Sequence, residues 1–186
     1  MLFRSAKQAF IEQNTPLARM LVSSIGTPSL STDALSEITG VPAVTIRAWI
    51  KRGHIELRTT ERPGTGKAML FSFHDAVEIM ALSQLARLGI APGKFAAHAS
   101  ETVMSTVMQQ ISELAGVWGT ERIWEDNMKR FVVLYHSVRA QGLDFSVVSD
   151  PINNILPDDS VKIVFDCRQL AVFSINRFRA HLANNK

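Results

Sequence analysis

Apolar residues recur every three or four positions along much of this chain, which is the spacing of amphipathic helices. Residues 2–22 show this pattern, although Pro16 lies among them and is expected to start a second short helix at 17–22. Further helices are predicted over 72–88, 92–117 and 168–182, and Gly89 is expected to end the first of these three.

Two short helical segments joined by a glycine occupy residues 31–53. Ser31 or Thr32 can cap the first helix, and Gly40 suits a tight turn. Pro42 is expected at the first position of the second helix, and Gly53 just past its end. The side chains expected to face inward are Ala34, Leu35, Ile38, Val41, Val44, Ile46, Trp49 and Ile50. Two short helices with such a turn predict a helix-turn-helix.

A β-hairpin is predicted directly after this pair of helices. Residues 55–58 and 68–71 can form its strands, and 61–67 supply two glycines and a proline for its tip. The run Gly64–Lys67 lacks the spacing of a phosphate-binding loop, so nucleotide binding is not expected. The hairpin therefore reads as the wing of a winged helix-turn-helix.

The helix over 92–117 carries a seam of apolar residues spaced alternately three and four apart, as in a coiled coil. One interpretation is dimerisation, and the alternative is packing on this chain's own C-terminal domain, because periodicity alone does not separate the two. The residues of the seam are Met104, Val107, Ile111, Leu114 and Trp118.

The sequence after residue 118 predicts a short helix at 120–130, strands at 131–138, 145–148 and 161–165, and then the last helix, over 168–182. The fold class expected is α+β, mainly α. Its four parts are a helical extension (1–29), the winged helix-turn-helix (30–90), a linking or dimerisation helix (91–118) and a small C-terminal α+β domain (119–186).

Composition and charge narrow the class of protein. Hydrophobic residues make up 46% of the chain, which suits packed cores, and the single cysteine forbids an intramolecular disulfide. With no signal peptide and no membrane span recognisable, a cytoplasmic protein is expected. Residues 1–99 carry 11 Lys+Arg against 7 Asp+Glu, and residues 100–186 carry 9 against 10. A basic front half suits DNA binding, and the alternative is chance clustering on a solvated face.

The stretch from Leu30 to about His98 resembles the MerR superfamily of regulators. That family shows a helix-turn-helix followed by T-I-R-Y-Y-E, R-G-L, a wing ending G-Y-R-L-Y-S, and a helix ending L-G. This chain has T-I-R-A-W-I at 45–50, R-G-H at 52–54, K-A-M-L-F-S at 67–72 and L-A-R-L-G at 85–89. The order and spacing make the resemblance fairly specific.

The resemblance implies which residues touch DNA. Thr45 and Arg47 match the motif, and Trp49 takes the second Tyr position. Ala48 replaces the first Tyr, and Met69 stands where the wing arginine usually is, so Lys67 with Arg62 is expected to substitute. The expected DNA-binding residues are Thr32, Thr45, Arg47, Trp49, Lys51, Arg52, Arg58, Arg62 and Lys67.

A DNA-binding transcription regulator of a bacterial type is therefore expected, working as a homodimer on a two-fold site in double-stranded DNA. The resemblance also implies RNA polymerase as a candidate partner. The alternative is a DNA-architectural or recombination accessory factor of the excisionase kind. A third reading, motivated by Ala48 and Met69, is a protein-interaction module that no longer binds DNA.

Other chemistry has weaker support in the sequence. No enzyme activity, cofactor or metal is expected, since histidines are scattered and hydrolase motifs are missing. Cys167 reads as a buried hydrophobe rather than a nucleophile, and Asp158, Asp159 and Asp166 read as turn or capping residues rather than cation ligands. A small apolar ligand remains a candidate partner of the C-terminal domain. The candidate lining is Trp118, Trp124, Phe131, Tyr135 and Phe145, and the favoured alternative is that these aromatics belong to the core.

Overall fold

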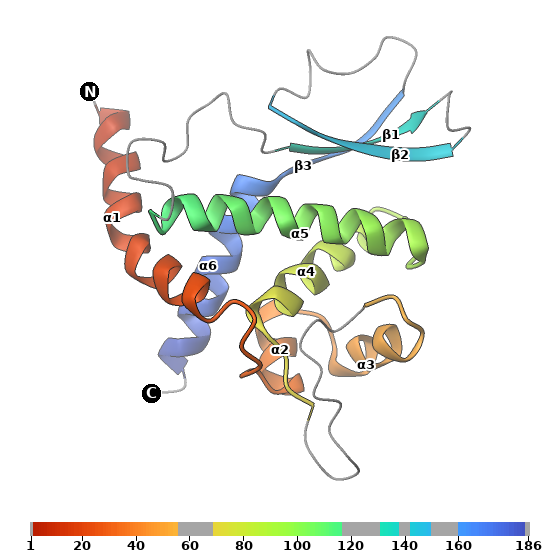
Figure 1. The fold of residues 1–186 in the computed structure, drawn as a ribbon, viewed down its shortest axis with the longest axis horizontal. Helices are drawn as coiled ribbons and strands as arrows, with labels where there is room; N and C mark the ends of the chain where they lie inside the picture. Colours follow the sequence, from red (N-terminus) through yellow and green to blue (C-terminus); the bar gives the residue numbers. More distant parts are fainter. Residues whose placement is uncertain (1, 56–68, 117–130, 138–141, 150–159, 185–186) are drawn as a thin grey trace.

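The fold is mainly helical with one small sheet, an α+β arrangement as predicted (Figure 1). The computed structural model describes residues 2–55, 69–116, 131–137, 142–149 and 160–184. The predicted helix at 120–130, the wing tip and Trp118 lie outside these ranges. The elements are α1 (Leu2–Ser23), α2 (Thr32–Thr39), α3 (Ala43–Lys51), α4 (Phe73–Arg87), α5 (Lys94–Leu114), β1 (Phe131–Ser137), β2 (Gly142–Val148), β3 (Ser160–Asp166) and α6 (Cys167–Asn184).

Helix α5 runs through the middle of the molecule, with the sheet on one side and α4, α2 and α3 on the other (Figure 1). It contacts α1, α4, α6 and β1. The four described members of its apolar seam are Met104, Val107, Ile111 and Leu114, each 0% exposed. In the single chain the seam therefore packs against this chain's own elements, and a dimer formed through it would first have to uncover it.

Helix α1 continues without interruption through Pro16, so the predicted restart of the helix at residue 17 is wrong. A proline inside a helix removes one backbone hydrogen bond and costs about 3 kcal/mol. Contacts with the far end of α5 offset that loss. The hydroxyl of Thr15 lies 2.7 Å from the Ile11 carbonyl and 3.2 Å from that of Leu114, and Arg19 Nε donates to the Ala115 carbonyl at 2.9 Å.

The three strands form an antiparallel sheet in the order β2-β1-β3. Leu134 pairs with Phe145 on one side and with Ile163 on the other, and directly paired residues share a face. This face turns toward α5, where the Phe145 ring lies 6.1 Å from that of Phe95 and 5.1 Å from that of His98.

The predicted grouping of five aromatic residues around one ligand pocket is wrong for its described members. Side chains alternate along a strand, so Phe131 and Tyr135 lie on the opposite face of the sheet from Leu134 and its partner Phe145. Trp118 and Trp124 lie outside the described residues. The three described aromatics therefore do not converge on one cavity.

Helix α4 begins as the sequence indicates. Ser72 caps it, and the Asp75 side chain accepts from the Ser72 backbone N–H at 2.7 Å, which completes a capping box. Because α2, α5 and α6 all pack around it, α4 is buried on several faces rather than one. Leu88, the C-cap of the helix, is 55% exposed.

Candidate nucleic-acid interface

Helix α3 is held by one face and leaves the other free. Ile46 is 0% exposed and Trp49 7%, and both belong to the hydrophobic core. On the other side lie Val44, Arg47 and Lys51, which are exposed and follow one another at i, i+3 and i+7. That spacing places the three side chains along one stripe of the helix.

The turn between α2 and α3 is closed by hydrogen bonds that fix the angle of α3. Gly40 adopts φ 70°, a left-handed conformation that favours glycine, and its N–H donates to the Ser36 carbonyl at 2.9 Å. The Ser36 hydroxyl donates to the Val41 carbonyl at 2.8 Å, and Val41 itself is 3% exposed. Pro42 precedes the helix as its N-cap, one position earlier than expected.

The end of α3 exposes two further cations before the chain turns away. Lys51 is its last residue and Arg52 its C-cap, and both are exposed. Gly53 takes φ 70°, its N–H donates to the Ile50 carbonyl at 3.0 Å, and the His54 N–H donates to that of Trp49 at 2.9 Å. This pair of bonds is a Schellman motif, which stops the helix at the predicted glycine.

Helix α6, from the end of the chain, supports α2 from behind. Arg177 Nε donates to the Ile38 carbonyl at 2.8 Å, and its Nη2 donates to the Glu37 carbonyl. The last carbonyls of a helix lack partners within the helix, and a cation there also complements the helix dipole. Arg177 therefore completes the C-terminal end of α2.

The Glu37 side chain adds a second link between these two helices. Its Oε2 lies 2.9 Å from His181 Nδ1, and Asn184 Nδ2 donates to its Oε1 at 3.4 Å. The hydrogen bond with His181, followed by that with Asn184, lowers the pKa of Glu37 below its ordinary range. The carboxylate is thus tied to α6 and not offered to the surface that carries Arg47.

The structure brings part of the predicted DNA-binding set together. Arg47, Lys51 and Arg52 are exposed on or beside α3, and Thr32 and Thr45 are half-buried in the first turns of α2 and α3. Arg58, Arg62 and Lys67 lie outside the described residues. Met69, at the usual wing-arginine position, packs partly buried against the core.

Two expectations about α3 need correction. Trp49 was expected both to face inward and to touch DNA, and its side chain lies in the core beside Ile46, because three residues separate them on one helix face. Val44 was expected in the core and is instead 72% exposed. Its place in the stripe with Arg47 and Lys51, three and seven residues on, was the sequence signal that could have shown this.

Comparison with known families finds a match. Residues 30–94 match the model of the MerR HTH family regulatory proteins. This stretch is similar to the MerR-type helix-turn-helix domain. The match covers a little over a third of the chain and supports a DNA-binding transcription regulator. No curated protein matches the chain.

Outside residues 30–94, Cys167 was the one candidate nucleophile. It is 0% exposed, and burial, reinforced by the charge of Asp166, raises the pKa of Cys167 to about 12. A thiol that is buried and protonated is a poor nucleophile. Asp166 accepts from the backbone N–H of Arg168 at 3.0 Å and so caps α6, while Asp158 and Asp159 lie outside the described residues.

The described part of the chain holds no cluster of three His, Cys, Asp or Glu side chains that could bind a metal ion. None of its helices combines the length and apolar character needed to cross a bilayer.

Proposed function

We propose that this chain regulates transcription by placing α3 in the major groove of a two-fold-symmetric DNA site. The observation that carries the proposal is the free face of α3. It presents Val44, Arg47 and Lys51 in one stripe, with Arg52 at its end and no acidic residue on the helix. Buried Ile46 and Trp49 hold the opposite face to the protein.

Each exposed residue has a distinct proposed role. Arg47 binds backbone phosphate, and Lys51 and Arg52 reach base edges, where cations recognise guanine. Val44 contacts thymine methyl groups, because an apolar side chain on a groove-facing stripe fits no other base-edge feature as well. Thr32 and Thr45 bind phosphates through their hydroxyls. The wing residues Arg58, Arg62 and Lys67 complete the set from the minor-groove side.

A symmetric homodimer is part of the proposal, since two copies of α3 would match two half-sites about one helical turn apart. The proposal also includes action in the cytoplasm together with RNA polymerase. The family match to residues 30–94 supports these expectations through the resemblance alone.

The test of α3 is Arg47→Ala, assayed by fluorescence anisotropy with specific and random duplex DNA. We expect weaker binding to every sequence and a salt dependence reduced by about one unit of slope, since one phosphate contact is removed. Lys94→Ala, which removes an exposed cation from the start of α5, is the matched control. Unchanged binding of a folded Arg47→Ala protein would refute the assigned role.

Base reading is tested separately with Lys51→Ala and Arg52→Ala. If either side chain reads a base edge, affinity should fall by about 1–3 kcal/mol at its preferred base pair and much less elsewhere. Equal losses on specific and random DNA would mean that both residues only touch phosphate.

A recombination accessory factor could carry the same DNA-binding domain. The docking of α6 on α2 favours a regulator, because the C-terminal region then contacts the DNA-binding domain directly. A reporter assay separates the two: a regulator changes transcription from a promoter that carries its site, and an accessory factor changes only recombination.

A further inference from the structure

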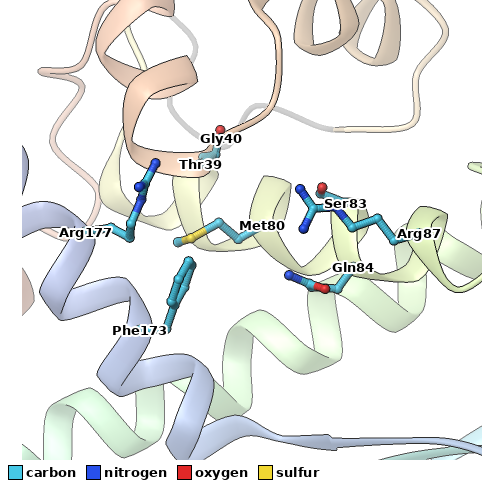
Figure 2. A pocket seen from close by; sticks show the side chains of 8 residues that line it. All are labelled: Thr39, Gly40, Met80, Ser83, Gln84, Arg87, Phe173 and Arg177. Atoms are coloured by element: carbon cyan, nitrogen blue, oxygen red, sulfur yellow. The ribbon is translucent and has the colours of Figure 1, made fainter.

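A small cavity lies where α2, α4 and α6 meet, behind the helix-turn-helix (Figure 2). Its volume is about 190 Å³. Drug-sized ligands occupy pockets of about 300–1,000 Å³, so this cavity suits a smaller molecule. The lining residues are Thr39, Gly40, Met80, Ser83, Gln84, Arg87, Phe173 and Arg177.

The lining side chains converge because of their spacing on two helices. Met80, Ser83, Gln84 and Arg87 stand at i, i+3, i+4 and i+7 on α4, and therefore share one face. Phe173 and Arg177 stand four apart on α6 and do the same. Figure 2 shows Met80 pointing toward Phe173 and Arg177 pointing to the end of α2.

The cavity combines an apolar end with a cationic one. Met80 and Phe173 offer a thioether and an aromatic ring, both of which pack well against another ring. The polar lining includes two arginines and no carboxylate. Arg177 is already bonded to the α2 carbonyls and lies close to Glu37, so Arg87 supplies most of the uncompensated positive charge.

Three polar side chains in this lining are available to a ligand. Within the described part of the chain, Ser83, Gln84 and Arg87 form no side-chain hydrogen bond or ion pair. An arginine guanidinium binds a carboxylate through two parallel hydrogen bonds, and a hydroxyl and an amide can donate further hydrogen bonds to the same carboxylate. These groups are aligned along α4 next to the apolar end.

We propose that this cavity binds a small carboxylate with an aromatic or similarly apolar body, and that the bound molecule acts as an effector. The carboxylate lies on Arg87 with Ser83 and Gln84, and the apolar body lies between Met80 and Phe173. Because Thr39, Gly40 and Arg177 form the opposite wall, occupancy changes how α6 holds the end of α2. Only this link to DNA affinity rests on the proposed function.

The binding test uses benzoate as the probe and the ¹³C-methyl resonance of Met80, assigned with Met80→Leu, as the site-specific readout. Benzoate should shift this resonance saturably. Benzamide, which has the ring without the charge, and inorganic phosphate, which has charge without the ring, should each bind at least about tenfold more weakly. A silent Met80, or equal binding by either control molecule, would overturn the proposed ligand class.

A pair of variants then locates the anion. Arg87→Gln should weaken benzoate binding by about tenfold or more, because it removes the charge that faces the carboxylate. Lys94→Gln removes one exposed cation elsewhere and should leave benzoate binding as it is. Wild-type affinity in Arg87→Gln would exclude the proposed anchor.

The effector role is tested by measuring DNA affinity by fluorescence anisotropy with and without benzoate. Benzoate should change the affinity of the wild-type protein and not that of Arg87→Gln. Absence of DNA binding even without benzoate would count against the proposed function and leave the Met80 result standing. A saturable Met80 shift with unchanged DNA affinity would overturn the effector role.

Discussion

Helices α3 and α5 both show a clear apolar stripe in the sequence, but the structure uses them in opposite ways. In α3 two core residues hold the helix, and the stripe on its other side, including Val44 at 72% exposed, is free. In α5 the stripe and much of the remaining surface are covered by α1, α4, α6 and β1. The spacing of apolar residues therefore indicates which face of a helix is apolar. How many other helices and strands pack around the helix decides whether a second face stays exposed to bind a partner molecule.

The largest expected effect comes from removing side-chain volume in α5. Ile111→Ala should lower the free energy of unfolding by about 2–5 kcal/mol, because it leaves a cavity in a packed core. Val44→Ala, the matched change on the free face of α3, should stay within about 0.5 kcal/mol. Urea unfolding monitored by circular dichroism measures both.

The same unfolding experiment separates the two readings of the α5 seam. If the seam is only an intramolecular core, Ile111→Ala should lower the midpoint equally at two widely different protein concentrations. A loss that depends on concentration would show that the seam also stabilises a dimer, and the contrast with α3 would fail.

A smaller effect is expected from the contact that ties the helix-turn-helix to α6. Arg177→Gln should cost about 1–3 kcal/mol, because two carbonyls at the end of α2 lose a charged donor. Hydrogen exchange should then show faster opening of α2 than of α5. Arg87→Gln, on the neighbouring helix, is the control and should leave exchange in α2 unchanged; equal acceleration in α2 and α5 would contradict a local role.

The smallest expected effect is a change of stability with pH, and its sign is opposite for two glutamates. Burial is the main cause that raises the pKa of Glu113 on α5, whereas the hydrogen bond with His181 is the main cause that lowers the pKa of Glu37 on α2. The folded state thus favours protonated Glu113, and stability is lost as pH rises from the ordinary value of 4.5 through its raised pKa. For Glu37 the sign is reversed, and stability is lost as pH falls below 4.5 through its lowered pKa.

Glu113→Gln and Glu37→Gln test these two signs in one series of melts. The first variant should gain stability relative to the wild type as pH rises toward neutrality. The second should lie below the wild type at neutral pH and approach it in acid. Two variants whose differences from the wild type do not change with pH would contradict both assignments.

Local signals in the sequence predicted the helix-turn-helix well. The cap at Ser31 or Thr32, the turn at Gly40 and the stop at Gly53 each act within a few residues. The structure contains the turn and the stop and places the cap on Ser31. The three strands of the small sheet were also placed, although their order in the sheet was not predicted. Most of the wing, residues 56–68, lies outside the described residues and stays a prediction. In the described part of the second predicted strand, 69–71, Phe71 pairs with Leu30 in an isolated bridge.

Long-range contacts were beyond the reach of the same reasoning. The Arg177 contact with Ile38 joins residues 139 apart, and the sequence next to either residue carries no signal that predicts the contact. The same holds for the cavity lined by Arg87 and Phe173, which exists only once α4 and α6 have packed. Pro16 shows the converse, since contacts with the end of α5 override a local signal for a helix break.

The hydrogen bonds from Arg177 to the end of α2 can form only after both segments of the chain have been synthesised. A ribosome adding about 5–20 residues per second needs about 7–28 s to travel the 139 residues from Ile38 to Arg177. A nascent chain can form α2 and α3 during that interval, but without the support of α6. The helix-turn-helix therefore gains the support of α6 only after Arg177 has been synthesised.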